Sequence, residues 1–105
     1  MHRPVQSKAK VFARVKKNES ALKSLGVKRL GLFGSFVKGK QKIKSDVDFL
    51  VEFDQGSKSF DNYMRLSFFL EDLMGRRVEL ITPESLSPYI GPHIIEEVEY
   101  AALSA

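Results

Sequence analysis

The stretch that decides the fold reads GLFGSFVKGKQKIKSDVDFLVEF, residues 31–53. It opens inside the run Val27 to Phe33, which alternates and then turns apolar, as a strand entering a core does. Gly34-Ser35 interrupts that strand, and the lysine-rich segment Gly39 to Ser45 is typical of a loop. A second strand, Asp46 to Phe53, is rich in β-branched and aromatic residues. We therefore expect two strands of one sheet, joined by a polar connection.

The flanking sequence predicts helices and one more strand. Apolar residues recur at helical spacing on both sides of the two strands, and Gly26 and Gly75 follow two of these periodic segments as stop signals. We expect helices over Ser7–Leu25, Phe36–Lys38, about Phe60–Met74 and His93–Ala102, and a third strand over Arg77–Ile81. This alternating order predicts an α/β fold, a small β-sheet flanked by helices, in a single domain over residues 1–105.

Two aspartates lie in the second strand where charge is costly. Asp46 and Asp48 are two residues apart, so their side chains project from the same face of the sheet. Crowded carboxylates repel each other unless a cation lies between them, and Mg²⁺ prefers such oxygen ligands. Glu79, in the third strand, completes a cluster of three carboxylates if the two strands are neighbours. Taken alone, each acid is more typical of a solvated strand position.

Gly34-Ser35 is a candidate phosphate site. A glycine at a strand-to-helix junction lets the backbone approach a phosphate, and the helix start and the serine hydroxyl supply donors. A simple turn is the ordinary interpretation of such a pair. Lys38 and the loop lysines add positive charge nearby, although lysines in a loop also serve solubility.

Composition excludes several classes of protein. The chain has 105 residues, a net charge of +4 and no cysteine, which excludes disulfides and cysteine-ligated zinc and favours a cytoplasmic setting. No apolar stretch is long enough to span a membrane, and no signal peptide is evident. Residues 1–44 carry a charge of +12 and residues 45–105 a charge of −8. Such asymmetry suggests a phosphate or polyanion partner, yet the basic part lacks interleaved aromatics, so no dedicated nucleic-acid surface is evident.

The spacing of these motifs resembles that of a known family. Ten residues separate Gly34-Ser35 from Asp46-Val47-Asp48, which matches the Gly-Ser…Asp-X-Asp signature of the DNA polymerase beta nucleotidyltransferase superfamily. The quoted stretch closely resembles the minimal nucleotidyltransferases of the MntA type. The resemblance continues through GRRVELITPESL, residues 75–86, to the final helix, and so covers nearly the whole chain from about Val27.

The resemblance implies a polymerase beta-like fold, a small mixed sheet, and a set of site residues. Nucleotide binding would fall to Gly34, Ser35 and Lys38, while Asp46, Asp48 and Glu79 would be catalytic and bind two Mg²⁺ ions, with ATP as substrate. Two positions depart from the family pattern. Lys38 stands where arginine is frequent and loses the bidentate fork, and Glu79 stands where aspartate is frequent.

By the same resemblance, the protein would transfer AMP from ATP to a hydroxyl, a tyrosine, of a HEPN-domain toxin, and so act as its antitoxin. An acceptor delivered by a partner protein explains why the chain carries no acceptor-binding domain. Two alternatives stay open. One is a non-catalytic antitoxin that neutralises its toxin by contact alone, and the other is a nucleotidyltransferase acting on a small molecule or a nucleic acid.

Overall fold

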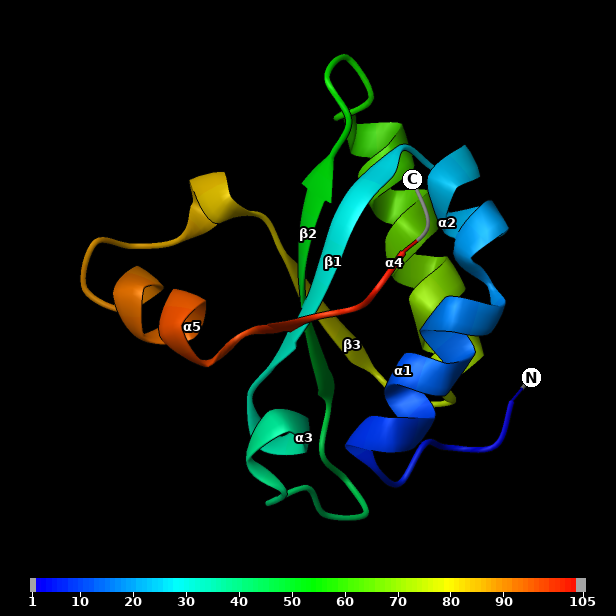
Figure 1. The fold of residues 1–105 in the computed structure, drawn as a ribbon, viewed down its shortest axis with the longest axis vertical. Helices are drawn as coiled ribbons and strands as arrows, with labels where there is room; N and C mark the ends of the chain where they lie inside the picture. Colours follow the sequence, from blue (N-terminus) through cyan, green and yellow to red (C-terminus); the bar gives the residue numbers. More distant parts are fainter. Residues whose placement is uncertain (1, 104–105) are drawn as a thin grey trace.

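A four-stranded mixed sheet organises the protein, which we describe from a computed structural model over residues 2–103. Its strands are β1 (Val27–Phe33), β2 (Val47–Phe53), β3 (Val78–Ile81) and β4 (Glu99–Tyr100), in the order β3-β2-β1-β4. β1 runs antiparallel to both β2 and β4, whereas β2 and β3 are parallel. The expected small mixed sheet flanked by helices is confirmed (Figure 1).

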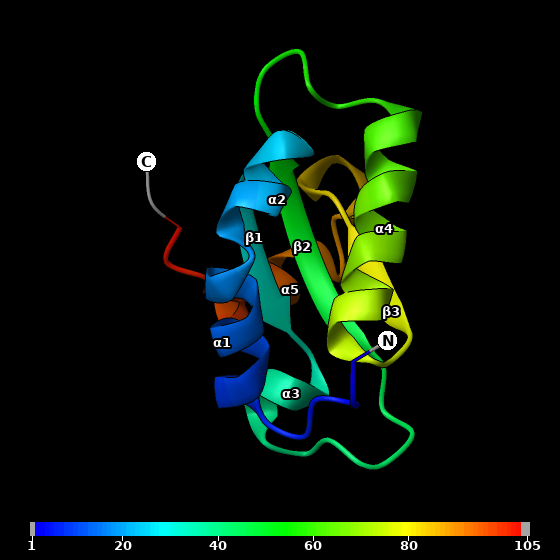
Figure 2. The same cartoon turned by 90° about the vertical axis from the view of Figure 1, so that its right-hand side faces the viewer.

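One face of the sheet is covered by helices. α1 (Lys8–Lys17), α2 (Glu19–Ser24) and α4 (Phe60–Met74) lie over this face (Figure 2). Alternate strand residues point into the core beneath them, and the fully buried ones include Leu30, Leu32, Val47, Phe49 and Val51. The alternation in β2 therefore places its apolar residues as the sequence predicts.

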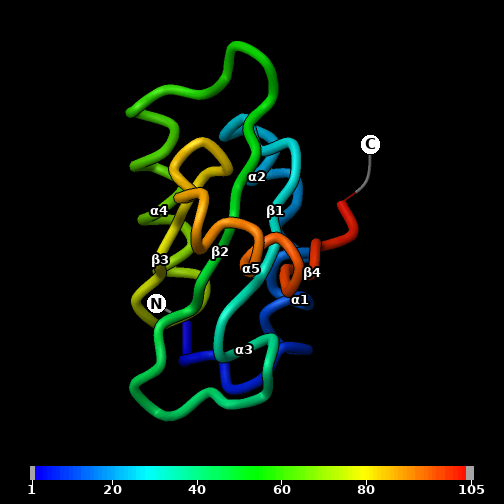
Figure 3. Tube along the Cα trace, turned by 90° about the vertical axis from the view of Figure 1, so that its left-hand side faces the viewer, coloured from blue at the N-terminus to red at the C-terminus, as the bar shows by residue number. Residues whose placement is uncertain are grey.

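The opposite face carries the charged strand residues and is crossed by the chain after β3. This segment holds the short 3₁₀ helix η1 (Pro83–Ser85) and α5 (Gly91–Glu97), which Figure 3 shows on the side away from α1, α2 and α4. A further short helix, α3 (Ser35–Lys38), lies where β1 ends. At Gly31, an added Cβ would lie 2.5 Å from Val98 Cγ2 and 3.0 Å from Tyr100 Cδ1. The absent side chain thus lets β4 and the residue before it pack closely on β1.

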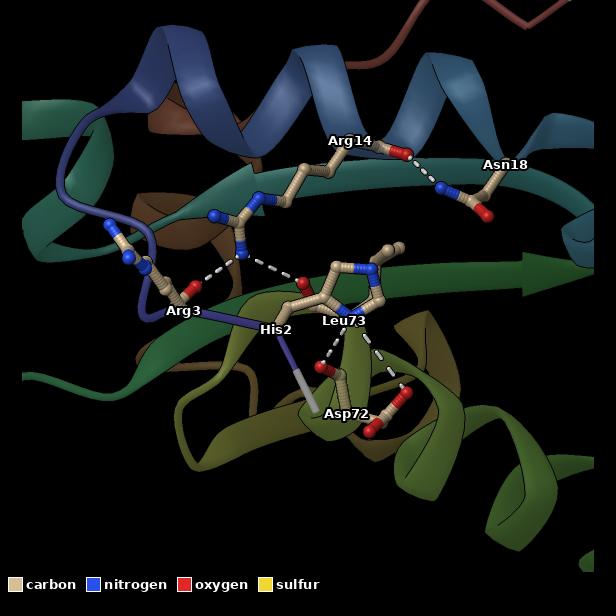
Figure 4. Close-up of polar contacts among 6 residues, drawn as sticks. All are labelled: His2, Arg3, Arg14, Asn18, Asp72 and Leu73. Atoms are coloured by element: carbon tan, nitrogen blue, oxygen red, sulfur yellow. Dashed lines mark hydrogen bonds and ion pairs between the residues drawn. The ribbon is translucent and has the colours of Figure 1, made fainter.

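Two expected helices differ from those observed. The segment Ser7–Leu25 forms two helices, because the chain breaks at Asn18, whose side chain donates to the carbonyl of Arg14 at 2.8 Å (Figure 4). Asparagine competes for backbone groups in this way and disfavours helix interiors. The expected final helix His93–Ala102 is wrong: α5 begins earlier and ends at Glu97, and the next residues join the sheet as β4.

The N-terminal segment is fastened to the end of α4. Arg14 Nη1 donates to the carbonyls of Arg3 at 2.6 Å and Leu73 at 2.9 Å, so one guanidinium bridges two chain segments (Figure 4). His2 Nδ1 also lies 3.1 Å from the carbonyl of Asp72. None of the helices in residues 2–103 is long and apolar enough to cross a membrane.

Candidate active site

The candidate site lies where β1 ends and β2 begins. Because these strands are antiparallel, Phe33 is paired with Asp48, and the turn that starts at Gly34 comes beside that carboxylate. Gly34 has φ +78°, and a Cβ there would lie 2.2 Å from Asp48 Oδ2. Only glycine suits both this backbone conformation and this approach. The sequence-predicted turn and the second aspartate are thus in direct contact.

Asp48 and Glu79 are neighbours across the parallel pair of strands. They are paired in the β2–β3 register, so their side chains leave the same face of the sheet. Burial is the largest cause of a rise in the pKa of Asp48 to about 7, and Glu79, Asp46 and Glu97 add to it. Near neutral pH this pair of acids can share one proton, as closely spaced carboxyls do.

Asp46 precedes β2 by one residue and is exposed. The loop that leads into it is held by one arginine. Arg76 Nη1 donates to the carbonyls of Lys42 at 3.1 Å, Ile43 at 2.8 Å and Ser45 at 3.1 Å. This guanidinium therefore fixes the backbone immediately before Asp46. Sequence reasoning did not single out Arg76, whose place just after the αL glycine of α4 gives no sign of long-range contacts.

Gly34, Ser35 and Lys38 lie together around the short helix α3, as expected from their spacing. Lys38 is exposed, and its ammonium is paired with Glu97, with Nζ and Oε2 3.2 Å apart. The other oxygen of that carboxylate, Oε1, accepts from the Gly34 N–H at 3.0 Å. Within residues 2–103, the Ser35 hydroxyl makes no hydrogen bond to another side chain or backbone group. Two of the three candidate nucleotide donors are thus bound to one carboxylate of the protein itself.

Glu97, like Arg76, is a residue of this region that sequence reasoning missed. It lies on the segment that was expected to form one helix from His93 to Ala102. Glu97 faces the turn at Gly34, and Glu99 lies in β4, where its carboxylate pairs with Lys8 at 3.1 Å. The alternation of apolar Val98 and Tyr100 with acids was the available sign that this segment is a strand.

Some of the basic residues in the first part of the sequence form ion pairs with acidic residues of the second part. Three basic residues of the first 44 pair with acids of the second part: Lys8 with Glu99, Arg29 with Glu52, and Lys38 with Glu97. Arg29 also lies over the ring of Tyr100, 3.8 Å from its centroid. The basic half is therefore complemented by the acidic half as well as being available to other anions.

The residues predicted to bind divalent cations are Asp46, Asp48 and Glu79. In residues 2–103, no three or more His, Asp or Glu side chains are arranged in a group that could hold a metal ion. The chemistry of the donors fits nevertheless, because Mg²⁺ commonly takes only one or two carboxylates together with substrate phosphates. The pKa of Asp48 is raised first by burial and then by nearby negative charge, and a cation in place of the shared proton would relieve that charge.

The fold and these side chains define a class: an α/β domain that presents acids from neighbouring strands beside a glycine–serine turn. The model of the nucleotidyltransferase domain family matches residues 15–103, so the chain belongs to that family and is a nucleotidyltransferase. It is 41% identical over 75 residues to the protein adenylyltransferase MntA of Thermococcus cleftensis, covering 71% of this chain and 75% of that protein.

Solved structures share the fold. A structure named provisionally as a minimal nucleotidyltransferase superposes with a TM-score of 0.76 at 29% identity, covering 90% of this chain and 95% of that one. Another match is to a structure of a tri-AMPylated HEPN toxin of Shewanella oneidensis in complex with an MNT antitoxin. The TM-score is 0.54 at 17% identity, and the match covers 84% of this chain and 71% of that one. At that identity the second likeness concerns the fold alone.

Proposed function

We propose that this nucleotidyltransferase moves AMP from ATP onto a tyrosine hydroxyl of a HEPN-domain partner, and that it thereby acts as the antitoxin of that partner. The observation that carries the proposal is the Asp48–Glu79 pair beside the Gly34 turn. The two carboxylates are so close that ionising both costs free energy. They lie beside a backbone N–H that suits a phosphate oxygen. A protein with no chemistry to perform gains nothing from crowding charge in this way.

The proposed acceptor is supported by the relatives. The protein of Thermococcus cleftensis is named as a protein adenylyltransferase, and the complex from Shewanella oneidensis contains a toxin that carries AMP groups. The present chain aligns with three quarters of the first protein.

We assign nucleotide binding to Gly34, Ser35 and Lys38. The Gly34 N–H and the Ser35 hydroxyl would each donate to a phosphate oxygen, and the Lys38 ammonium would offset part of the triphosphate charge. Asp46, Asp48 and Glu79 would hold two Mg²⁺ ions. When bound, Mg²⁺ supplies charge neutralisation for the departing pyrophosphate and lowers the pKa of the attacking hydroxyl.

The reaction is an in-line displacement at the α-phosphorus. The tyrosine oxygen forms a bond to that phosphorus, and the bond from phosphorus to the pyrophosphate oxygen breaks. The carboxylate of Glu79 would accept the hydroxyl proton; its exposure and its position on the strand beside Asp48 support this role. Lys38 and Gly34 would stay with the departing phosphates. Arg76 would keep the backbone before Asp46 in place throughout.

The test uses the protein with its cognate HEPN-domain partner, Mg²⁺ and ATP labelled at the α-phosphate. We expect label on the partner, lost when the acceptor tyrosine is replaced by phenylalanine. ATP labelled at the γ-phosphate should leave no label, which separates AMP transfer from phosphorylation. Neutralisation of the partner without label would establish a binding antitoxin instead, and label on a small molecule or nucleic acid alone would establish a different acceptor.

A further inference from the structure

The carboxylate of Glu97 occupies donors that the proposed function gives to a nucleotide. Its Oε1 accepts from the Gly34 N–H at 3.0 Å, and its Oε2 lies 3.2 Å from Lys38 Nζ. The side chain reaches across 63 positions of sequence and is only 25% exposed. Both of its oxygens are therefore engaged by groups that also suit a phosphate.

A backbone N–H has one proton and serves one strong acceptor at a time. A phosphate oxygen at Gly34 and the Glu97 carboxylate are chemically equivalent acceptors for it, and both carry negative charge. Lys38 can donate to more than one partner, but its charge is partly offset while Glu97 is paired with it. Gly34 is thus the point of direct competition, and Lys38 is the point of shared charge.

We propose that Glu97 is an internal competitor of the nucleotide: its carboxylate holds the Gly34 N–H and Lys38, and the incoming triphosphate displaces it. This inference rests on the proposed function, in that it takes Gly34 and Lys38 to be phosphate ligands. Glu97 thereby lowers the affinity for ATP and connects nucleotide entry to α5, at whose end it lies.

The geometry of the turn supports the same direction. The Glu97 carboxylate is held at the Gly34 N–H, and Gly34 is the residue that lies against the Asp48 carboxyl. Moving the Glu97 carboxylate away removes one negative charge from this turn when the triphosphate brings more, so its displacement favours binding of the phosphate.

The test measures the dissociation constant of AMP-PNP with Mg²⁺ by titration calorimetry on the full chain. Glu97→Gln keeps the size of the side chain but removes its charge, and we expect it to bind the nucleotide about 3- to 10-fold more tightly, the scale of a lost charge-assisted contact. Glu96→Gln is the matched control, because it removes the same charge one residue away from an exposed position. Its affinity should equal that of the wild type.

A second variant separates contact from charge. Glu97→Asp keeps the charge but is one methylene too short for both contacts, so we expect a smaller tightening; it also serves if Glu97→Gln unfolds, as judged by circular dichroism. Unchanged or weaker binding in the folded Glu97 variants would overturn the inference, since it would make Glu97 neutral or a positioning residue. If the wild type binds and transfers AMP in that case, the proposed function survives. Absence of nucleotide binding in every variant would overturn both.

Discussion

The two faces of the sheet are built from the same three strands but have different roles. On the face under α1, α2 and α4, strand residues are apolar, buried and matched across the register, as Leu32, Phe49 and Leu80 illustrate. On the other face, the next residues along the same strands include Asp48 and Glu79, whose charges oppose each other. Burial of apolar side chains on the first face lowers the free energy of the folded state. The closely spaced acids on the second face raise it. Stability and chemistry are thereby separated by a single step along each strand.

The largest expected effect lies on the acidic face. Asp48→Ala should reduce AMP transfer to the partner by a factor of at least about 10³, because catalytic metal ligands contribute several kcal/mol to the transition state. The fold should stay intact, with an unchanged circular dichroism spectrum. Glu52→Gln is the control: it lies on the same face of the same strand, is paired with Arg29, and should keep near-wild-type activity. Substantial transfer by Asp48→Ala would contradict the assigned chemistry.

The opposite result is expected for the helix-covered face. Phe49 is only 1% exposed, and Phe49→Ala should lower the free energy of unfolding by about 3–5 kcal/mol through lost burial and a cavity. Phe49→Leu, at about 1 kcal/mol, keeps the comparison measurable if the first variant does not fold. Urea unfolding at 15 °C measures both. The neighbouring-strand variant Glu79→Gln should not lower stability, because it removes a charge that opposes Asp48; a loss like that of Phe49→Ala would show that the acidic face is also a packed core.

The same contrast explains what the sequence predicts well. β1, α4 and the inward side of β2 follow from apolar spacing alone, because a buried face imposes a period of 2 or 3.6 on the residues that form it. The contact between Gly34 and Asp48 also follows, once two strands joined by a loop are placed side by side.

The remainder depends on contacts that leave no period in the sequence. The break at Asn18 comes from one side-chain hydrogen bond, and β4 forms because Gly31 leaves room for Val98 and Tyr100. Glu97 reaches the site only because α5 ends early and the chain turns back to β1. Such features depend on tertiary packing, which overrides local helix propensity.

The turn at the end of β1 gives the next prediction. Gly34→Ala places a methyl group against Asp48 Oδ2 at a positive φ, so we expect a loss of about 2 kcal/mol in the free energy of unfolding together with a strong loss of AMP transfer. Gly39→Ala is the matched control, because Gly39 has φ +70° but nothing within 4 Å of the added Cβ. It should cost only the backbone strain, about 1 kcal/mol, and keep activity. Equal effects of the two substitutions would mean that the closeness to Asp48 is unimportant.

The smallest expected effect is the pH dependence that the acidic face imposes on stability. The pKa of Asp48 is raised from 3.8 to about 7, so between these values the folded protein holds a proton that the unfolded chain has released. Its contribution to the free energy of unfolding therefore falls as pH rises through this window and is lowest above pH 7. Asp48→Asn cannot ionise, so it should match the wild type near pH 4 and exceed it at pH 8 by about 1 kcal/mol, after allowance for the solvent exposure of this carboxyl.

Urea unfolding of both proteins at pH 4 and pH 8, without divalent cations, measures that difference, and taking it between two proteins at each pH cancels the other titrating groups. Glu52→Gln should give no gain at pH 8, because its carboxylate is paired with Arg29. Adding Mg²⁺ at pH 8 should stabilise the wild type and leave Asp48→Asn nearly unchanged, which would narrow the gap. If the difference in the free energy of unfolding between the two proteins were the same at both pH values, ionisation of Asp48 would carry no penalty. The two faces would then differ in polarity alone, without charge repulsion on the acidic face.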